Sequence, residues 1–204
     1  RDTGQPCAMR LFRIGTAAVA GVLVVTPAAA APESKPKPVN VFIEGDSLTV
    51  GAAGGLRQRL RPHVKKVKID AQVGRFTSTG LSRVARASRA QHARVWVLAL
   101  GTNDGPYPHQ LRQHVLRSLR MAGPSRDVVW VTIKRPGGYR RVNTALRAMD
   151  ARYDNLHVVD WAKTVSRYPG LIGGDRVHGT TRGYQVRAKM IADATLAVVT
   201  ARGA

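Results

Sequence analysis

Residues 39–51 read VNVFIEGDSLTVG. The apolar start of this stretch has the length and the β-branched content of a buried strand, and residues with helical spacing follow the serine. The segment GDSL at 45–48 therefore indicates a tight turn from a strand into a helix. A serine in such a turn is exposed at the end of the strand, and its own N–H lies near the positive end of the helix dipole. The stretch predicts a nucleophile at Ser47, and the alternative is that Asp46 or Ser47 only caps the helix.

Apolar runs of this kind recur along the chain, and a segment with helical spacing follows each of them. The predicted strands are Val39–Ile43, Val67–Ala71, Val95–Leu100, Val128–Ile133 and Leu156–Val159. The predicted helices are Ala52–Leu60, Leu81–Gln91, Gln110–Ala122, Val142–Tyr153 and Gly183–Val199. This alternation predicts an α/β fold, a three-layer αβα sandwich with a flavodoxin-like, parallel five-stranded sheet and helices on both faces. In such sheets ligands bind outside the carboxyl ends of the strands, so we expect the chemistry in the loops there.

Residues 1–38 differ in composition from the rest of the chain. Arg10 and Arg13 precede an apolar segment of about a dozen residues, and small residues follow at 27–31, an order typical of a secretory signal peptide. That segment is shorter than the roughly 20 apolar residues of a membrane-spanning helix, although an uncleaved anchor is the alternative. We expect a signal peptide at 1–30 whose residues 1–8 precede the start at Met9, a Pro/Lys linker at 31–38 and the folded domain at 39–204. The processed protein is expected to be secreted, without a transmembrane span, and monomeric.

The chain is strongly basic, with 33 Lys and Arg residues against 12 Asp and Glu, for a formal net charge of +21. The electrostatic field of such a net charge influences which partners approach a protein, but it does not determine the fold. We expect electrostatic association with anionic envelope polymers, which would retain the protein at the cell envelope; an Arg-rich composition without function is the alternative. Nucleic acid would be attracted by charge alone, so no specific nucleic-acid partner is predicted.

The Cys and His residues do not indicate a metal site. The single cysteine, Cys7, allows no intrachain disulfide and no Cys-based zinc site, and it lies in the expected signal peptide. The histidines that show no paired-ligand spacing are His63, His92, His109, His114 and His157. We therefore predict neither a metal nor a cofactor.

Two further loops at predicted strand ends or before the last helix carry polar residues suited to catalysis. GTND at 101–104 places an amide where it can donate a hydrogen bond to developing negative charge, with an ordinary Asn/Gly turn as the alternative. DRVH at 175–178 spaces an Asp and a His so that the His can act as a general base that the Asp orients. A surface histidine is the alternative. Because these loops and GDSL are expected at one edge of the sheet, we predict a single site.

Together these segments resemble the SGNH, or GDSL-type, hydrolases over roughly residues 39–199. The matching blocks are GDSL at 45–48, Gly74 within DAQVGR at 70–75, GTND at 101–104 and DRVH at 175–178. The resemblance implies that Ser47 is the nucleophile, His178 the base and Asp175 its orienting acid. It also implies an oxyanion hole made by the N–H groups of Ser47 and Gly74 and the side chain of Asn103. Arg176 stands where the family usually has glycine, so the loop and the fit of substrate are expected to differ.

A closer likeness exists to the extracellular SGNH domain of membrane acyltransferases that O-acylate peptidoglycan or other polysaccharides. It rests on residues 70–75, on LGTN at 100–103, on Asn143 and on Asp160-Trp161, the last with strand-end packing as the alternative. The resemblance implies a secreted serine esterase that removes short acyl groups, O-acetyl above all, from cell-envelope or other polysaccharides. One alternative is an O-acyltransferase acting on cell-wall sugars. The other, a catalytically silent cationic wall-binding protein, has no need of the complete set of catalytic residues.

Overall fold

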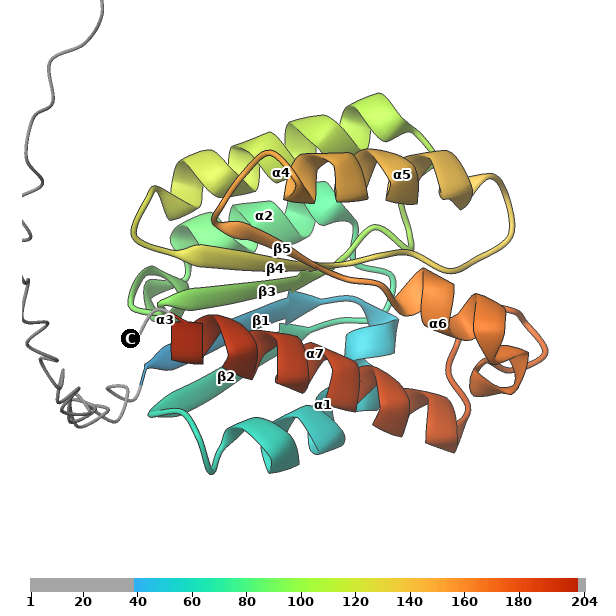
Figure 1. Ribbon diagram of the computed structural model, residues 1–204, viewed down its shortest axis with the longest axis horizontal. Coiled ribbons are helices and arrows are strands. Elements are labelled where there is room, and N and C mark those ends of the chain that lie inside the picture. The colour runs from blue at the N-terminus through green and yellow to red at the C-terminus, as the bar shows by residue number, and fades with distance from the viewer. Residues whose placement is uncertain (1–38, 202–204) are drawn as a thin grey trace, which may run out of the picture. The chain divides into compact units, whose positions relative to one another are not determined.

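The computed structural model describes residues 39–201 (Figure 1). The strands are β1 (Asn40–Gly45), β2 (Lys66–Ala71), β3 (Val95–Ala99), β4 (Asp127–Val131) and β5 (Leu156–Val159). The helices are α1 (Ser47–Leu60), α2 (Thr77–Arg86), α3 (Ser88–Gln91), α4 (Pro108–Ala122), α5 (Tyr139–Asp150), α6 (Trp161–Arg167), the 3₁₀ helix η1 (Pro169–Leu171) and α7 (Thr181–Ala201). The predicted signal peptide and linker at 1–38 lie outside the described residues.

The sheet has the order β2-β1-β3-β4-β5, and each strand is parallel to its neighbours. Figure 1 shows α1 and α7 on one face of the sheet and α2, α4 and α5 on the other. The predicted three-layer sandwich with a flavodoxin-like sheet is therefore confirmed. The order reverses direction between β1 and β3, and in open α/β sheets such a switch point opens the crevice where ligands bind.

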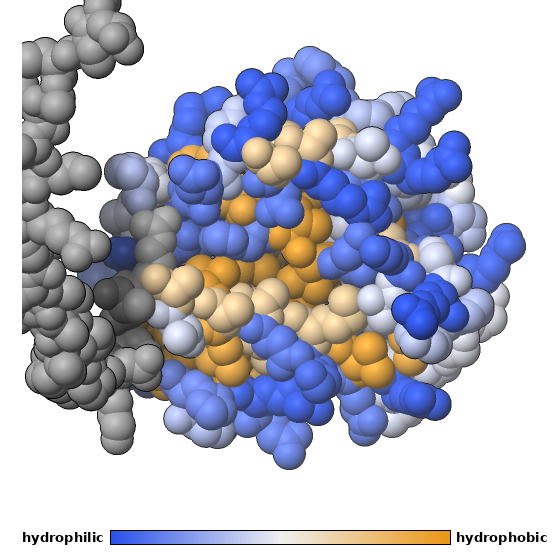
Figure 2. Space-filling view, in the orientation of Figure 1, coloured by the Kyte–Doolittle hydropathy of each residue, from blue (hydrophilic) through white to orange (hydrophobic). Residues whose placement is uncertain are grey.

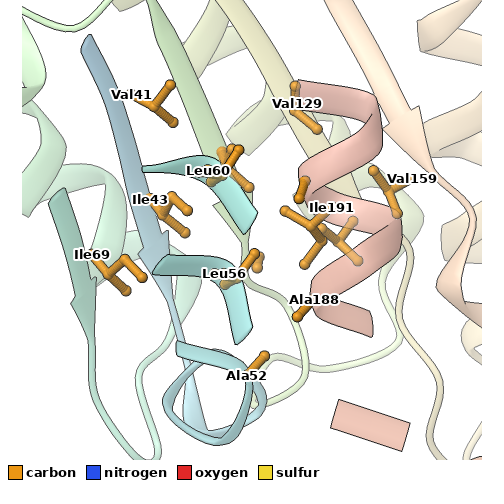
Figure 3. Packing of buried hydrophobic residues seen from close by; sticks show 14 of the residues in the cluster. Val41, Ile43, Ala52, Leu56, Leu60, Ile69, Val129, Val159, Ala188 and Ile191 are labelled. Carbon is orange, nitrogen blue, oxygen red and sulfur yellow. The ribbon is translucent and has the colours of Figure 1, made fainter. Parts of the chain in front are cut away.

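One half of the core lies between the sheet and the helices α1 and α7. Figure 3 shows Ile43 and Val129 of the sheet with Leu56 of α1 and Ile191 of α7, whose side chains fill the space between strands and helices. All four are fully buried. Burying a side chain of this size stabilises a fold by about 1.5–3 kcal/mol, so this layer fixes the strand that leads into the GDSL turn.

The other half of the core lies between the sheet and the helices α2, α4 and α5. Along each strand, the residues that fill it alternate with those that face α1 and α7. Phe42 follows Val41 in β1, and Trp96 follows Val95 in β3, each pair divided between the two core layers. This period of two is the geometry of a strand buried on both faces, and it explains why the strands read as continuous apolar runs. On the face in view in Figure 2, hydrophilic residues cover most of α4 and α5, and apolar residues are exposed between α5 and α7.

Several helices begin or end elsewhere than the spacing predicts. Helix α1 begins at Ser47 and not at Ala52, because the Asp46 side chain accepts a hydrogen bond from an N–H of the first turn. Helix α5 covers Tyr139–Asp150, three residues earlier than predicted. Helix α6 is not predicted by the sequence pattern; its N-cap is Asp160.

The predicted helix at 81–91 is two helices. Its chain is extended at Ala87, so that α2 ends and the short α3 follows. Hydrogen bonds from outside α3 hold this short helix in place: the Trp96 indole donates to the Ala90 carbonyl at 2.7 Å, and Arg126 donates to the Gln91 carbonyl at 2.6 Å. Within residues 39–201, no helix combines the length and the hydropathy that a membrane span requires.

Candidate active site

The GDSL turn places Ser47 at the carboxyl end of β1. A Cβ atom at Gly45 would lie 2.1 Å from the Thr49 hydroxyl, so the close return of the chain requires glycine there. The Asp46 carboxylate accepts the Leu48 N–H at 3.0 Å and caps α1. Ser47 is therefore the first helical residue, and its N–H has no partner within the helix. Of the two residues that the sequence offers as a cap for this helix, Asp46 is the cap. The Ser47 hydroxyl does not cap the helix.

The structure brings Ser47, His178 and Asp175 together in a hydrogen-bonded chain. Ser47 Oγ lies 3.0 Å from His178 Nε2, although 131 positions separate the two residues in sequence. His178 Nδ1 lies 2.6 Å from Asp175 Oδ2. A hydroxyl, an imidazole and a carboxylate in this order allow the imidazole to take the hydroxyl proton while the carboxylate holds the ring in orientation.

The Asp175 carboxylate is held by the backbone of its own loop. Its Oδ1 accepts the N–H groups of Val177 and His178, each at 3.0 Å, which leaves Oδ2 for the imidazole. The hydrogen bond from His178, helped by these backbone N–H groups, lowers the pKa of Asp175 to about 2. The carboxylate is therefore ionised throughout the neutral range. The His178 and Asp175 side chains are 49% and 51% exposed, so the site is open to solvent.

Arg176, which stands where the SGNH pattern usually has glycine, adopts a backbone conformation typical of glycine. Its φ angle is +58°, in the left-handed region that glycine adopts without strain. The loop is closed by hydrogen bonds from Gly173 N–H to the His178 carbonyl at 2.8 Å and from Arg176 N–H to the Gly173 carbonyl at 3.0 Å. Arginine at this position thus keeps the backbone shape that glycine would give and adds a positive charge beside the site.

The predicted oxyanion donors come from the loops after β2 and β3. Gly74 has a φ angle of +73°, and no atom lies within 4 Å of the place where its Cβ would stand. Among residues 39–201, no protein group accepts its N–H. Asn103 Nδ2 donates to the Arg75 carbonyl at 3.1 Å, which uses one of its two amide hydrogens and leaves the other for a ligand.

Backbone hydrogen bonds join these loops to the GDSL turn. The Gln72 N–H donates to the Gly45 carbonyl at 3.2 Å, and the Asp46 N–H donates to the Ala99 carbonyl at 3.3 Å. The loops after β1, β2 and β3 therefore meet at one edge of the sheet, as the sequence predicts.

Arg75 anchors the loop that carries Gly74, a role that the sequence reasoning did not identify. Its guanidinium donates to a carboxyl oxygen of Glu44, to the Asp70 carbonyl at 2.9 Å and to the Asp70 carboxylate at 2.9 Å. The residue is 5% exposed, so these bonds lie largely out of water. The signal that could have revealed the clamp is a glutamate within the otherwise apolar first strand, near an Asp-to-Arg pair at the end of the second.

Asp104 couples the β3 loop to α2. Helix α2 has no side-chain cap of its own; instead the Asp104 carboxylate accepts the Thr77 N–H at 3.2 Å and also the Thr77 hydroxyl. A carboxylate at a helix N-terminus stabilises the helix, because it accepts hydrogen bonds from N–H groups that have no partner within the helix and interacts favourably with the positive end of the helix dipole. The last residue of GTND therefore has a structural function beside Asn103.

Two charged residues near the GDSL turn, Asp46 and Arg187, are buried. Burial raises the pKa of Asp46, and the positive charge of Arg187 on α7 opposes that rise. Burial likewise lowers the pKa of Arg187 to about 10, and its guanidinium lies 5.4 Å from the centre of the Trp161 ring. Among the described residues, no group of three or more His, Cys, Asp or Glu is arranged to hold a metal ion.

Glu44 makes the stability of this scaffold depend on pH. Burial raises its pKa from 4.5 to about 8, although the Arg75 charge opposes the rise. Between these values the folded state holds a proton that the unfolded state has lost, so the free energy of unfolding falls as the pH rises. Glu44→Gln removes the titrating group and keeps an oxygen that can accept from Arg75. As the pH rises from about 5 to about 8.5, we expect the free energy of unfolding of the wild type to fall relative to that of this variant. The fall is about 1.4 kcal/mol for each unit by which folding raises the pKa of Glu44.

Thermal unfolding of both proteins across this pH range checks the expectation. Asp193→Asn, which removes an exposed acid on α7 far along the chain from Glu44, serves as the control. A Glu44→Gln difference that is the same at both ends of the range would show that Glu44 does not titrate there.

No model of a protein family matches the sequence, and no curated protein matches it with significant similarity. Solved structures, in contrast, match most of the chain. The C-terminal catalytic domain of peptidoglycan O-acetyltransferase A from Streptococcus pneumoniae, solved with a methylsulfonyl adduct, matches with a TM-score of 0.66 at 21% identity. This match covers 79% of the present chain and 94% of the other.

Two esterase-type structures match equally well. The family 3 carbohydrate esterase of Clostridium thermocellum has a TM-score of 0.67 at 14% identity and covers 82% of this chain and 100% of its own. A lipase/acylhydrolase from Enterococcus faecalis has a TM-score of 0.68 at 18% identity and covers 78% of this chain and 96% of its own. Identities of this size establish a common fold, and the resemblance drawn from the sequence blocks is confirmed at that level. Residues 39–201 therefore have the three-layer fold of the SGNH, or GDSL-type, hydrolases.

Proposed function

We propose that this protein is a secreted serine esterase that hydrolyses short-chain acyl esters, O-acetyl above all, on cell-envelope or other polysaccharides. The observation that carries the proposal is the chain of hydrogen bonds from Ser47 Oγ through the His178 imidazole to the Asp175 carboxylate. It lies where the sheet order reverses and at the N-terminus of a helix. A binding module has no need for such an arrangement, which argues against a silent wall-binding protein.

The reaction follows from the placement of these groups. His178 Nε2 takes the Ser47 proton as Oγ forms a bond to the ester carbonyl carbon, and the carbonyl oxygen becomes an oxyanion. The N–H groups of Ser47 and Gly74 and the Asn103 amide stabilise that charge. The bond to the sugar oxygen then breaks, and this oxygen takes the proton from His178. Water, deprotonated by the same nitrogen, then attacks the carbonyl carbon of the acyl-serine. The bond from this carbon to Ser47 Oγ breaks, Oγ takes the proton back from His178, and the carboxylic acid is released.

The open site favours a short acyl group on a large alcohol. A long acyl chain is bound best in an apolar cavity, whereas the cavity that borders the Asp175 loop has three positive residues, Lys134, Arg135 and Arg176, beside its apolar ones. The half-exposed His178 and Asp175 side chains leave space for a polymer to approach. The signal-peptide pattern supports export, which would bring the enzyme to such polymers.

Transfer of the acyl group to a sugar hydroxyl is the second candidate. A hydroxyl can replace water in the last step without any change in the protein groups, and the open site admits an acceptor. The similarity to the catalytic domain of a peptidoglycan O-acetyltransferase favours this candidate. The two reactions differ only in the group that receives the acyl chain.

The test is a product assay with acetylated xylan, acetylated peptidoglycan and p-nitrophenyl esters of increasing chain length, with and without a sugar acceptor. We expect release of acetate, fastest for the shortest esters, and an acylated acceptor if transfer competes. Equal or faster hydrolysis of long-chain esters would contradict the assignment to short acyl groups. No ester hydrolysis by a folded protein would contradict the esterase itself.

Asn103→Ala is expected to lower kcat for an acetyl ester by about 10²–10³-fold, the usual effect of losing one oxyanion donor. The matched control is Asn155→Ala, because Asn155 also donates to backbone carbonyls, at 3.0 and 3.1 Å, but lies outside the loops of the site. Steady-state kinetics with p-nitrophenyl acetate measures both. Turnover by Asn103→Ala within threefold of the control would exclude Asn103 from the oxyanion hole.

A further inference from the structure

Two adjoining cavities lie beside the segment after β4: one borders the Asp175 loop, and the other lies between α5 and α6. Their volumes are about 420 Å³ and 550 Å³, and they share Lys134, Arg135 and Ser166 as lining residues. Six of the 17 lining residues are Lys or Arg, so every formally charged residue of the lining is positive. We call this surface the cationic groove and define it by Lys134, Arg135, Arg140, Arg147, Lys163 and Arg176.

The charge of the groove is mostly uncompensated. Neither cavity has an Asp or Glu among its lining residues. Within residues 39–201, Arg147 is the member of the set that makes an ion pair, with Asp160 at 2.8 Å. A concave surface lined by one sign of charge focuses the field and concentrates ligands of opposite sign, which an equally basic convex surface does less well.

The groove is continuous with the catalytic loop. Gly173 lines one cavity, and its N–H donates to the His178 carbonyl at 2.8 Å. Arg176, which lines the same cavity, lies between Asp175 and His178 in the chain. A ligand in the groove therefore lies beside the residues proposed to activate Ser47.

Arg135 is held in position at the centre of the groove. Its guanidinium donates to the Thr102 carbonyl, next to Asn103 in the chain, and lies 5.7 Å from the centre of the Tyr139 ring. A guanidinium fixed in this way presents its remaining N–H groups as a planar fork, which matches the geometry of carboxylate and phosphate oxygens. The groove thus combines focused charge with at least one oriented anion donor.

We propose that the cationic groove binds anionic units of the substrate, so that the enzyme acts on O-acylated polysaccharides that carry carboxylate or phosphate groups. This inference rests on the proposed esterase function and names its substrate class. The groove holds the polymer by its anionic units, while an ester on a neighbouring sugar reaches Ser47.

Two measurements test the proposal with the whole protein. The first is the dissociation constant for unacylated polygalacturonate and for polyphosphate, which separates a carboxylate source from a phosphate source. The second is the ratio of kcat/KM for O-acetylated polygalacturonate to kcat/KM for neutral O-acetylated dextran. The groove variant is Lys134→Gln/Arg140→Gln/Lys163→Gln, and the control is Arg57→Gln/Arg59→Gln/Arg61→Gln, which removes the same charge from the α1 surface.

We expect the groove variant to weaken binding of the preferred polyanion by about tenfold relative to the control, given the usual size of exposed charge interactions. The binding should weaken further between about 0.1 and about 1 M salt, as the screening length falls. If the carboxylate polymer is preferred, the kinetic ratio falls in parallel. The proposal is overturned if the groove variant binds both polyanions as tightly as the control does. Groove-dependent binding without any ester hydrolysis would instead refute the esterase and leave the groove assignment intact.

Discussion

Ser47→Ala is expected to lower kcat for an acetyl ester by about 10⁴–10⁶-fold, to a rate set by binding and the remaining oxyanion donors. The variant lacks the oxygen that forms the acyl intermediate. His178 then has no hydroxyl to deprotonate, since its Nε2 faces Ser47 Oγ at 3.0 Å. Loss of the nucleophile alone removes most of the rate because the members of such a relay act as a unit.

The fold should be insensitive to this substitution, which makes the result interpretable. The cap of α1 is the Asp46 carboxylate, and Ser47 itself contributes no side-chain bond to the helix. The melting temperature is therefore expected to stay close to that of the wild type. A sulfonyl fluoride should label Ser47 in the wild type and not in the variant, as mass spectrometry of the tryptic peptides would reveal.

The control for Ser47→Ala is Ser78→Ala, because Ser78 is an exposed serine on α2. It should retain full turnover. Turnover of Ser47→Ala within tenfold of this control would refute the nucleophile and with it the proposed mechanism. Labelling of another serine at the wild-type rate would do the same.

The parallel sheet could be predicted because its central strands are buried on both faces. Phe42 and Val41 enter different core layers, so the strand reads as one apolar run, and the turn residues after each run mark its end. The site loops could be predicted for the same reason: the carboxyl ends of parallel strands share one edge. The motifs GDSL, GTND and DRVH supply the side chains at that edge to which catalytic roles are assigned.

Features built by tertiary contacts could not be predicted. The break at Ala87 interrupts a segment with helical spacing, and the short α3 that follows is held by a hydrogen bond from Arg126, which is distant in sequence. The Arg75 clamp and the cationic groove depend on which charged residues meet in space, and a chain with 33 basic residues offers too many candidates for pattern to choose among. Helix α6 is too short for helical spacing to reveal.

Asp175→Asn is expected to lower kcat by about 10³–10⁴-fold, because it changes which nitrogen of the His178 imidazole carries the proton. Asp175 Oδ1 accepts two backbone N–H groups, from Val177 and His178, each at 3.0 Å. An asparagine must keep its oxygen at that position, so its NH₂ group faces His178 Nδ1. The imidazole then accepts at Nδ1 and carries its proton on Nε2, where it cannot take the proton of Ser47.

Three measurements separate this mechanism from simple damage to the loop. Because the pKa of Asp175 is held near 2 by the His178 hydrogen bond, the wild-type carboxylate is ionised at any working pH, and the loss in Asp175→Asn should not be recovered between about pH 6 and 9. Nitrogen NMR of the imidazole should show the proton moving from Nδ1 to Nε2. Asp193→Asn, an exposed acid on α7 that pairs with Lys189 at 2.6 Å, loses the same charge and should keep full turnover. If Asp175→Asn turned over within tenfold of that control, or lost activity without a change of tautomer, Asp175 would be a loop anchor and His178 would take its orientation from other groups.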